Sequence, residues 1–288
     1  HSPESAATPR PRVDAHILLA EDNPVNQDVA SSMLEMLGCR ITIAPNGRAA
    51  VEAATTGRFD LILMDCQMPE MDGFAATAAI RRQEATASDR RHVPVIALTA
   101  NAMEGDRARC LAAGMDDYLT KPFTVAQLHA VLTQWLTPQS AKASETDQAS
   151  SPHTTDADEP AATEEAPVST TIDKTAWDAI LSLQRPGRPD ILARVLATYL
   201  DDSRLLVEQI RSAVQLQDSV ALSQAAHRLK SSSAQLGVLA TAAHCKELET
   251  LGGLARIDEA AHLLSQLIEA HQFACTAITS ELQQRSAR

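Results

Sequence analysis

The chain has 288 residues, a formal net charge of −12, and 44% hydrophobic but only 3% aromatic side chains. The length allows two domains. The acidic balance argues against binding of a nucleic-acid backbone, which needs clustered Lys and Arg, and the few aromatic rings offer no platform for stacked bases. No apolar run approaches the ~18 residues that span a bilayer, so we expect no membrane contact by this part of the chain.

The cysteines indicate the cellular compartment of the protein, and the first residues indicate whether the chain is part of a longer one. The cysteines are five in number, without C-x-x-C spacing, so neither a disulfide framework nor a zinc site is expected and a reducing, cytoplasmic setting is indicated. The chain opens on His1 without a methionine, and residues 1–12 read as the remnant of an upstream linker. We therefore expect a piece of a longer protein.

Residues 13–138 alternate short apolar runs with amphipathic stretches. Strands are expected at 16–20, 39–44, 59–64, 93–98 and 117–119. Helices are expected at 25–37, 47–56, 73–84, 104–113 and 124–136. This alternation predicts an α/β domain with a five-stranded parallel, doubly wound sheet. Such sheets bind ligands at the carboxyl ends of their strands, where Asp22, Asp65, Thr99 and Lys121 fall.

Residues 139–171 differ in composition from everything around them. Val168 is their only large apolar side chain, and Ala, Ser, Thr, Pro, Asp and Glu dominate the rest. Such a segment cannot bury enough surface to offset the loss of chain entropy, so we predict a flexible acidic linker.

Residues 172–288 show helical patterns only and predict an all-α bundle. Asp173 is placed to cap a short helix, and Pro189-Asp190 to begin a long helix that runs to about residue 216. Asp218 is placed to cap the next helix, which runs to about residue 236. A further helix is expected at 238–250, Gly252-Gly253 are expected to end it, and a final helix is expected at 257–284.

The carboxyl ends of the predicted strands carry the parts of a phosphoryl-accepting site. Asp65 follows a buried-strand run, and its carboxylate could attack phosphorus if a cation offset the charge repulsion. Glu21, Asp22 and Asp65, with a loop carbonyl, offer the hard oxygen ligands that Mg²⁺ prefers. Lys121 could offset charge on the transferring group, and the Thr99 hydroxyl could bond one of its oxygens.

Four motifs in this region resemble a response-regulator receiver domain, which has the flavodoxin/CheY-like fold. They are residues 18–23 (LLAEDN), 63–73 (LMDCQMPEMDG), 97–100 (ALTA) and 118–123 (YLTKPF), and residues 22–27 (DNPVNQ) resemble receivers attached to hybrid sensor kinases. The resemblance implies that Asp65 is the phosphoacceptor and that Mg²⁺ is held by Glu21, Asp22, Asp65 and the Gln67 backbone carbonyl. It also implies that Thr99 and Tyr118 form a switch pair. Lys121 would sense the phosphoryl group and precede a cis proline.

A second candidate site lies on the helix that Asp218 is expected to cap. The helical period places an apolar face on that helix, made by Leu222, Ala225, Ala226, Leu229, Ser233 and Leu236. His227 falls out of phase with it, on a stripe of small and polar residues, so we expect its imidazole to stand clear of the bundle. Lys230, one turn away, could balance the charge of an incoming phosphoryl group.

Residues 226–237 (AHRLKSSSAQLG) resemble the phosphoacceptor helix of histidine-containing phosphotransfer (HPt) domains. The resemblance implies that His227 carries the phosphoryl group, with Lys230 and Ser231 as neighbours of the site, in a four-helix-bundle domain over 172–288. The family often has Gly after the lysine, and Ser231 stands there instead. His244 and the other histidines lack this setting and are expected to be surface or interhelical residues.

Together the motifs predict the receiver and HPt portion of a hybrid sensor histidine kinase, without the ATP-binding kinase core of the parent protein. Asp65 would accept a phosphoryl group from a kinase histidine and pass it through His227 to the receiver of a separate response regulator. The alternative is a docking module that sequesters a partner under the control of phosphorylation. A DNA-binding regulator is disfavoured because no basic recognition helix follows the receiver motifs, and a dehalogenase-type phosphatase because Gln67 replaces the second Asp of Asp-x-Asp.

Overall fold

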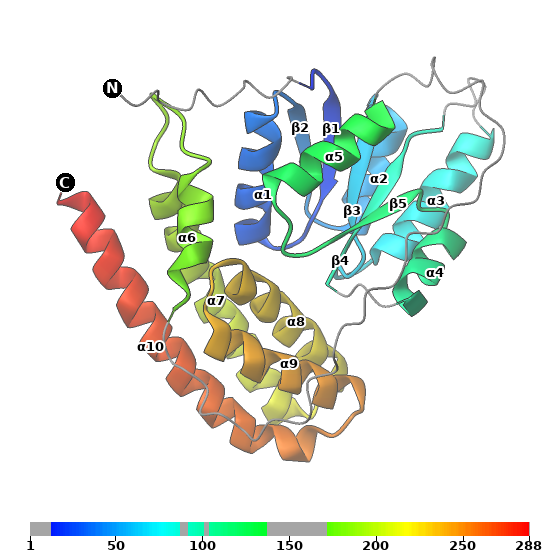
Figure 1. Cartoon of the computed structure of the whole chain (residues 1–288). Coiled ribbons are helices and arrows are strands. Elements are labelled where there is room, and N and C mark those ends of the chain that lie inside the picture. Colours follow the sequence, from blue (N-terminus) through cyan, green and yellow to red (C-terminus); the bar gives the residue numbers. More distant parts are fainter. Residues whose placement is uncertain (1–12, 87–91, 101–103, 137–171, 288) are drawn as a thin grey trace, which may run out of the picture.

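The computed structural model describes residues 13–86, 92–100, 104–136 and 172–287. Figure 1 shows a sheet flanked by helices, above a bundle of longer helices that contains the C-terminus. The predicted linker at 139–171 and the predicted remnant at 1–12 lie outside the described residues.

Five parallel strands form one sheet in the order β2-β1-β3-β4-β5. The strands are β1 (His16–Ala20), β2 (Arg40–Ala44), β3 (Leu61–Asp65), β4 (Val95–Thr99) and β5 (Asp117–Thr120). The helices between and after them are α1 (Pro24–Met36), α2 (Gly47–Thr56), α3 (Gly73–Thr86), α4 (Glu104–Ala112) and α5 (Val125–Leu136). The predicted doubly wound α/β fold is confirmed.

Helices cover both faces of the sheet, which is why β3 and β4 are buried along their whole length. Side chains of α1 and α5 pack on one face, with Ile17 and Leu63. Side chains of α2, α3 and α4 pack on the other, with Leu18 and Ile62. Neighbouring residues of a strand therefore belong to opposite faces, as strand geometry requires.

Strand ends differ slightly from the prediction. Asp65 is the last residue of β3, paired with Leu98 in the ladder, and β3 begins at Leu61, two residues later than predicted. Strand β4 extends to Thr99. Both side chains thus leave the sheet at its carboxyl edge, where the functional residues were expected.

The second half of the described chain is helical. Its elements are α6 (Lys174–Leu181), α7 (Ile191–Leu216), α8 (Ser219–Gln235), α9 (Leu239–Gly253), the 3₁₀ turn η1 (Ile257–Glu259) and α10 (Ala260–Ser286). Helices α7, α8, α9 and α10 each pack against their neighbours in a closed ring. The predicted four-helix bundle is confirmed, with α6 lying against α7 at its side.

Three details of the bundle test the expected helix boundaries. Asp173 and Asp218 cap α6 and α8 as predicted. The start of α7 was predicted one position early, because the Asp190 side chain accepts from the N–H of Ala193 and so makes Asp190 the cap. The glycine pair Gly252-Gly253 ends α9 as expected: the helix ends at Gly253, three residues beyond the predicted last helical residue. A Cβ on Gly252 would lie 2.8 Å from the backbone nitrogen of Ser223, so this glycine allows α8 and α9 to approach closely.

Helix α1 joins the two halves of the molecule. It lies between the sheet and the bundle and contacts α7 and α8 (Figure 1). Buried apolar side chains of the α1 side of the sheet and of the bundle form one continuous cluster. The carboxyl edge of the sheet therefore faces the bundle.

Candidate functional site

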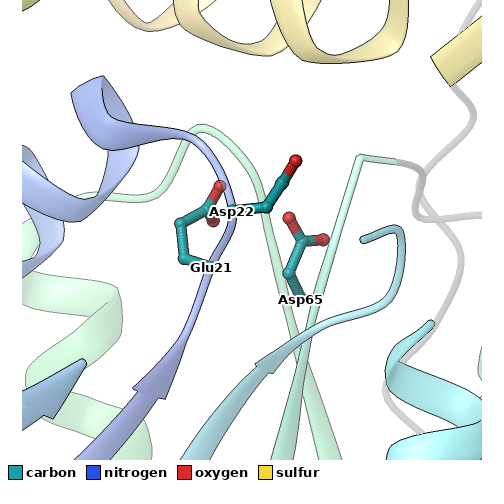
Figure 2. A group of neighbouring side chains, drawn as sticks. All are labelled: Glu21, Asp22 and Asp65. Atoms are coloured by element: carbon teal, nitrogen blue, oxygen red, sulfur yellow. The ribbon is translucent and has the colours of Figure 1, made fainter. Parts of the chain in front are cut away.

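Three carboxylates gather at the carboxyl edge of the sheet. Glu21 and Asp22 follow β1, Asp65 ends β3, and their oxygens lie within 4.8 Å of one another. Figure 2 shows the three side chains pointing toward a common space below the bundle. Glu21 and Asp65 are buried, at 1% and 4% exposure, so their charges are poorly solvated.

Lys121 lies against this cluster. Its Nζ donates to Asp65 Oδ2 and to Glu21 Oε2, both at 2.6 Å, and the predicted cis bond to Pro122 is confirmed. Glu21 Oε1 also accepts from the Asn26 amide at 3.0 Å. The bonds fix the direction of Asp65 and leave its Oδ1 facing the β3–α3 loop, where it accepts from the backbone N–H of Gln67 at 3.2 Å.

Burial and like charge act together on the acids. Burial, then the neighbouring Glu21 carboxylate, raise the pKa of Asp22 to about 6 despite the opposing charges of Arg228 and Lys121. Burial raises the pKa of Asp65 as well, against the lowering effect of Lys121. Burial would lower the pKa of Lys121, but Asp65 and Glu21 outweigh it and raise that pKa. The ammonium is therefore charged at neutral pH, and the acids are held in a site that favours added positive charge.

The remaining residues predicted for the aspartate site divide into two groups. Thr99 is buried at the end of β4 and lines a cavity together with Asp65 and Gln67. Tyr118 is half-buried on β5 and packs against the core on the α2–α4 side of the sheet. Thr99 thus lies beside the acidic residues, whereas Tyr118 lies two residues before the carboxyl end of β5.

That cavity lies between the two halves of the molecule and has a volume of about 630 Å³. Its wall from the sheet includes Asp22, Asp65 and Thr99, and its wall from the bundle includes His227 and Glu249. The two predicted phosphoacceptors therefore line one space.

The setting of His227 differs from the prediction. The apolar face expected on α8 is buried, but His227 is buried too, at 9% exposure, instead of standing clear. Its Nδ1 lies 2.7 Å from Glu249 Oε1 on α9. The helical period of α8 indicated only that His227 lies outside the apolar face of that helix. The carboxylate beside it belongs to α9, and the cavity is formed by the packing of the two halves.

Glu249 was not identified from the sequence. Its second carboxylate oxygen accepts from Lys230 Nζ, so one carboxylate joins His227 and Lys230. Burial opposes ionisation of Glu249, but the bonds from His227 and Lys230 outweigh it and hold its pKa below the usual value. The helical period of α9 could have placed Glu249 next to the buried Leu248, at the edge of the buried face. It could not have shown that this edge lies against α8 and His227.

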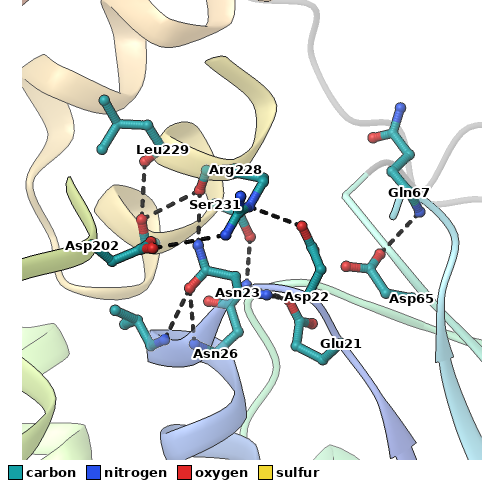
Figure 3. Close-up of polar contacts among 12 residues, drawn as sticks. Glu21, Asp22, Asn23, Asn26, Asp65, Gln67, Asp202, Arg228, Leu229 and Ser231 are labelled. Atoms are coloured by element: carbon teal, nitrogen blue, oxygen red, sulfur yellow. Dashed lines mark hydrogen bonds and ion pairs between the residues drawn. The ribbon is translucent and has the colours of Figure 1, made fainter. Parts of the chain in front are cut away.

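Polar contacts join the two halves of the molecule (Figure 3). The Asn23 amide donates to the backbone oxygen of Arg228 at 3.1 Å, and the Asn26 amide donates to the Ser231 hydroxyl at 2.8 Å. Arg228 Nε lies 2.9 Å from Asp22 Oδ2. Ser231, predicted as a neighbour of the histidine, thus contacts the sheet domain, and the helix that carries His227 is held against the loop that carries the acids.

Comparison with known proteins places both halves. Residues 17–133 match the response regulator receiver domain family, and residues 194–285 match the Hpt domain family. The chain belongs to the two-component phosphorelay proteins, in which a receiver domain is joined to an Hpt domain.

The relatives of the chain are hybrid sensor histidine kinases. The sensor histidine kinase GacS of Pseudomonas protegens is 34% identical over 273 residues, which cover 92% of this chain and 27% of the relative. Hybrid signal transduction histidine kinase B of Dictyostelium discoideum is 46% identical over 119 residues, 39% of this chain and 6% of the relative. The chain thus spans about a quarter or less of the length of these relatives.

A solved structure similar to the first half is the receiver domain of a sensor histidine kinase from Pseudomonas aeruginosa PAO1, with a magnesium ion coordinated in the active site cleft. It is 51% identical, covers 43% of this chain and 98% of that chain, and superimposes with a TM-score of 0.39.

The family matches favour the phosphorelay over the docking-only alternative. Among the described helices, none is long and apolar enough to cross a membrane.

Proposed function

We propose that this chain relays a phosphoryl group from a kinase histidine to Asp65, then to His227, and then to the receiver of a separate response regulator. The observation that carries the proposal is the shared cavity: the carboxylate and the imidazole line one space between the domains. Transfer within one chain then requires closure of that space but no exchange of domains. The matches to the receiver and Hpt families support a phosphorelay.

The residues at the carboxyl edge fit a magnesium ion. Glu21, Asp22 and Asp65 offer three carboxylates at ligand spacing, and we propose the Gln67 carbonyl as a further oxygen ligand. Hard oxygen ligands of this kind are those that Mg²⁺ takes in phosphoryl-transfer sites. When bound, the ion would offset the negative charge that gathers as phosphate approaches Asp65.

In the first transfer, an Asp65 carboxylate oxygen attacks phosphorus of a donor phosphohistidine. The new P–O bond forms as the P–N bond breaks, and the electron pair of the P–N bond stays on the departing imidazole nitrogen. Lys121, already 2.6 Å from Asp65, offsets charge on the phosphoryl oxygens, and the Thr99 hydroxyl at the cavity wall donates to one of them. Thr99 and Tyr118 would then change position together as the switch pair.

In the second transfer, His227 attacks the acyl phosphate. Because Nδ1 bonds Glu249, the attacking nitrogen is Nε2. The N–P bond forms as the P–O bond breaks, and the electron pair returns to the Asp65 carboxylate. The imidazole gains positive charge in this step, and the ionised Glu249 stabilises it through Nδ1–H, as a carboxylate does for a catalytic histidine. Lys230 offsets phosphoryl charge beside it.

The partners of the chain follow from this relay. Upstream is the kinase core of the parent protein, and downstream is a regulator whose receiver can reach His227. We also propose a cytoplasmic location. Five free thiols, four of them buried, are consistent with a reducing compartment.

The test uses the full chain, Mg²⁺ and labelled acetyl phosphate. The unaltered chain should gain label that resists base, as phosphohistidine does, whereas Asp65→Asn should gain none. His227→Gln should gain only base-labile acyl phosphate. His244→Gln is the matched control on α9 and should behave as the unaltered chain. Base-stable label in His227→Gln, or undiminished label in Asp65→Asn, would contradict the assignment.

A further inference from the structure

Helix α1 is covered on two sides. One side packs on the sheet through Val25, Val29 and Leu34, as in any doubly wound domain. Its opposite side faces the bundle, and of the 13 residues of α1 only Glu35 is exposed. The bundle therefore covers a helix face that a sheet domain by itself would leave in water.

The face of α1 toward the bundle carries an acidic stripe. Asp28, Ser32 and Glu35 follow one another at four and three positions, so they share one side of the helix. Asp28 Oδ2 accepts from the Thr198 hydroxyl at 3.1 Å, and Ser32 Oγ accepts from Arg194 at 3.2 Å.

Three arginines of the bundle lie against this stripe. Arg194 Nε lies 3.5 Å from Asp28, and Arg185 and Arg188 each lie 3.8 Å from a Glu35 oxygen. Arg185 also donates to the Glu35 backbone oxygen. The trio comes from the segment between α6 and α7 and from the first turn of α7. We call Arg185, Arg188 and Arg194 the arginine trio.

Asp190 is the only acidic residue in the segment 185–194, and it does not neutralise the charge of the arginine trio. Asp190 lies 2.8 Å from Arg285 of α10 and also caps α7, so its charge is already engaged within the bundle. The trio therefore presents net positive charge to whatever lies against it. The part of the bundle that contacts Asp28 and Glu35 is therefore basic, although the chain as a whole is acidic.

We propose that the arginine trio recognises a receiver domain by acidic residues seven positions apart on its first helix, and that the chain's own receiver thereby shields His227 from other receivers. The proposal rests on the relay proposed above, and it names the partner: a receiver with an acidic pair matching Asp28 and Glu35. Because the own receiver and the downstream regulator need the same face, they compete for it.

The exposures of the pairs fit a contact that opens and closes. The Arg194 and Arg188 side chains are 51% and 65% exposed, and exposed ion pairs are each worth a factor of only about 1.5 to 5 in an equilibrium. Such pairs select a partner and speed its encounter without holding it permanently. A relay needs that reversibility, since the phosphorylated bundle must release one receiver before it meets the next.

The experiment measures transfer between two full chains. The donor carries His227→Gln and is labelled at Asp65, then freed of acetyl phosphate. The acceptor carries Asp65→Asn and an intact His227. Base-stable label on the acceptor reports receiver-to-bundle transfer between chains, which requires the acceptor's own receiver to move aside.

Reversing the acidic stripe should act in opposite directions in the two chains. Asp28→Lys with Glu35→Lys in the acceptor should raise the rate about tenfold, because its bundle is no longer shielded. The same pair in the donor should lower the rate about tenfold, because its receiver no longer fits the trio. Arg188→Glu with Arg194→Glu in the acceptor should restore transfer from the reversed donor.

The control is Glu52→Lys, which changes an exposed acid on α2, on the other face of the sheet. It should leave the rate unchanged in either chain. Equal effects of stripe reversal in donor and acceptor, or none in either, would overturn the proposal. Failure of the relay itself would show differently, as absence of base-stable label in the unaltered chain.

Discussion

Replacing Glu249 with Ala removes one carboxylate that serves two partners, so its effects on stability and on transfer can be calculated separately. The carboxylate accepts from His227 Nδ1 at 2.7 Å and from Lys230 Nζ. Hydrogen bonds to charged groups contribute ~1.5–3 kcal/mol each. The three side chains are 11–21% exposed, so water replaces part of both bonds. We expect a loss of about 2–3 kcal/mol in the free energy of unfolding.

The same variant should slow transfer to His227. Glu249 stabilises the imidazole as it becomes positive, and a bond of ~1.5–3 kcal/mol that is present in the transition state corresponds to about 10- to 100-fold in rate. The assay labels the full chain at Asp65, then follows base-stable label with time. Glu247→Ala, an exposed acid on the same helix, is the control and should change stability by less than about 0.5 kcal/mol.

The pH dependence gives a further test of the same bond. Because the pKa of Glu249 in the folded chain lies below its ordinary value of 4.5, its contribution is complete above that pH and is lost as pH falls through the folded value. The stability gap between the unaltered chain and Glu249→Ala should therefore close in acid. A variant that unfolds more easily but transfers at the unaltered rate would refute the role at His227.

Three further predictions concern stability and the aspartate site. His227→Gln should cost about 1–2 kcal/mol, more than a surface change, because the side chain is buried and bonded; chemical denaturation measures this. Gly73→Ala should impair acetyl phosphate labelling, because a Cβ there would lie 2.1 Å from the carbonyl oxygen of Asp65; unaltered labelling would contradict the close packing. Tyr199→Phe should cost about 1 kcal/mol, since its buried hydroxyl bonds Ser233 at 3.0 Å; an unchanged thermal midpoint would count against that bond.

The amino-acid sequence was enough to predict the classes of both domains and their main elements. Short continuous apolar runs and stretches with period 3.6 are local signals, and they placed Asp65 and Thr99 at the carboxyl edge of a parallel sheet. Caps such as Asp173 and Asp218 act within one turn, so they too were readable. The end of α9 at the Gly252-Gly253 pair was readable in the same way, but the close approach of α8 to Gly252 was not, because a neighbouring helix leaves no local signal.

Only the tertiary structure decided the environment of His227 and the docking of the two domains. The phase of α8 predicts which side of the helix leaves the bundle core, but Glu249 reaches His227 from another helix, 22 residues away in sequence. The contacts between Asn26 and Ser231 span 205 residues, and each side chain alone looks like an ordinary surface amide or hydroxyl. Contacts of this range depend on how whole elements pack, which no local period records.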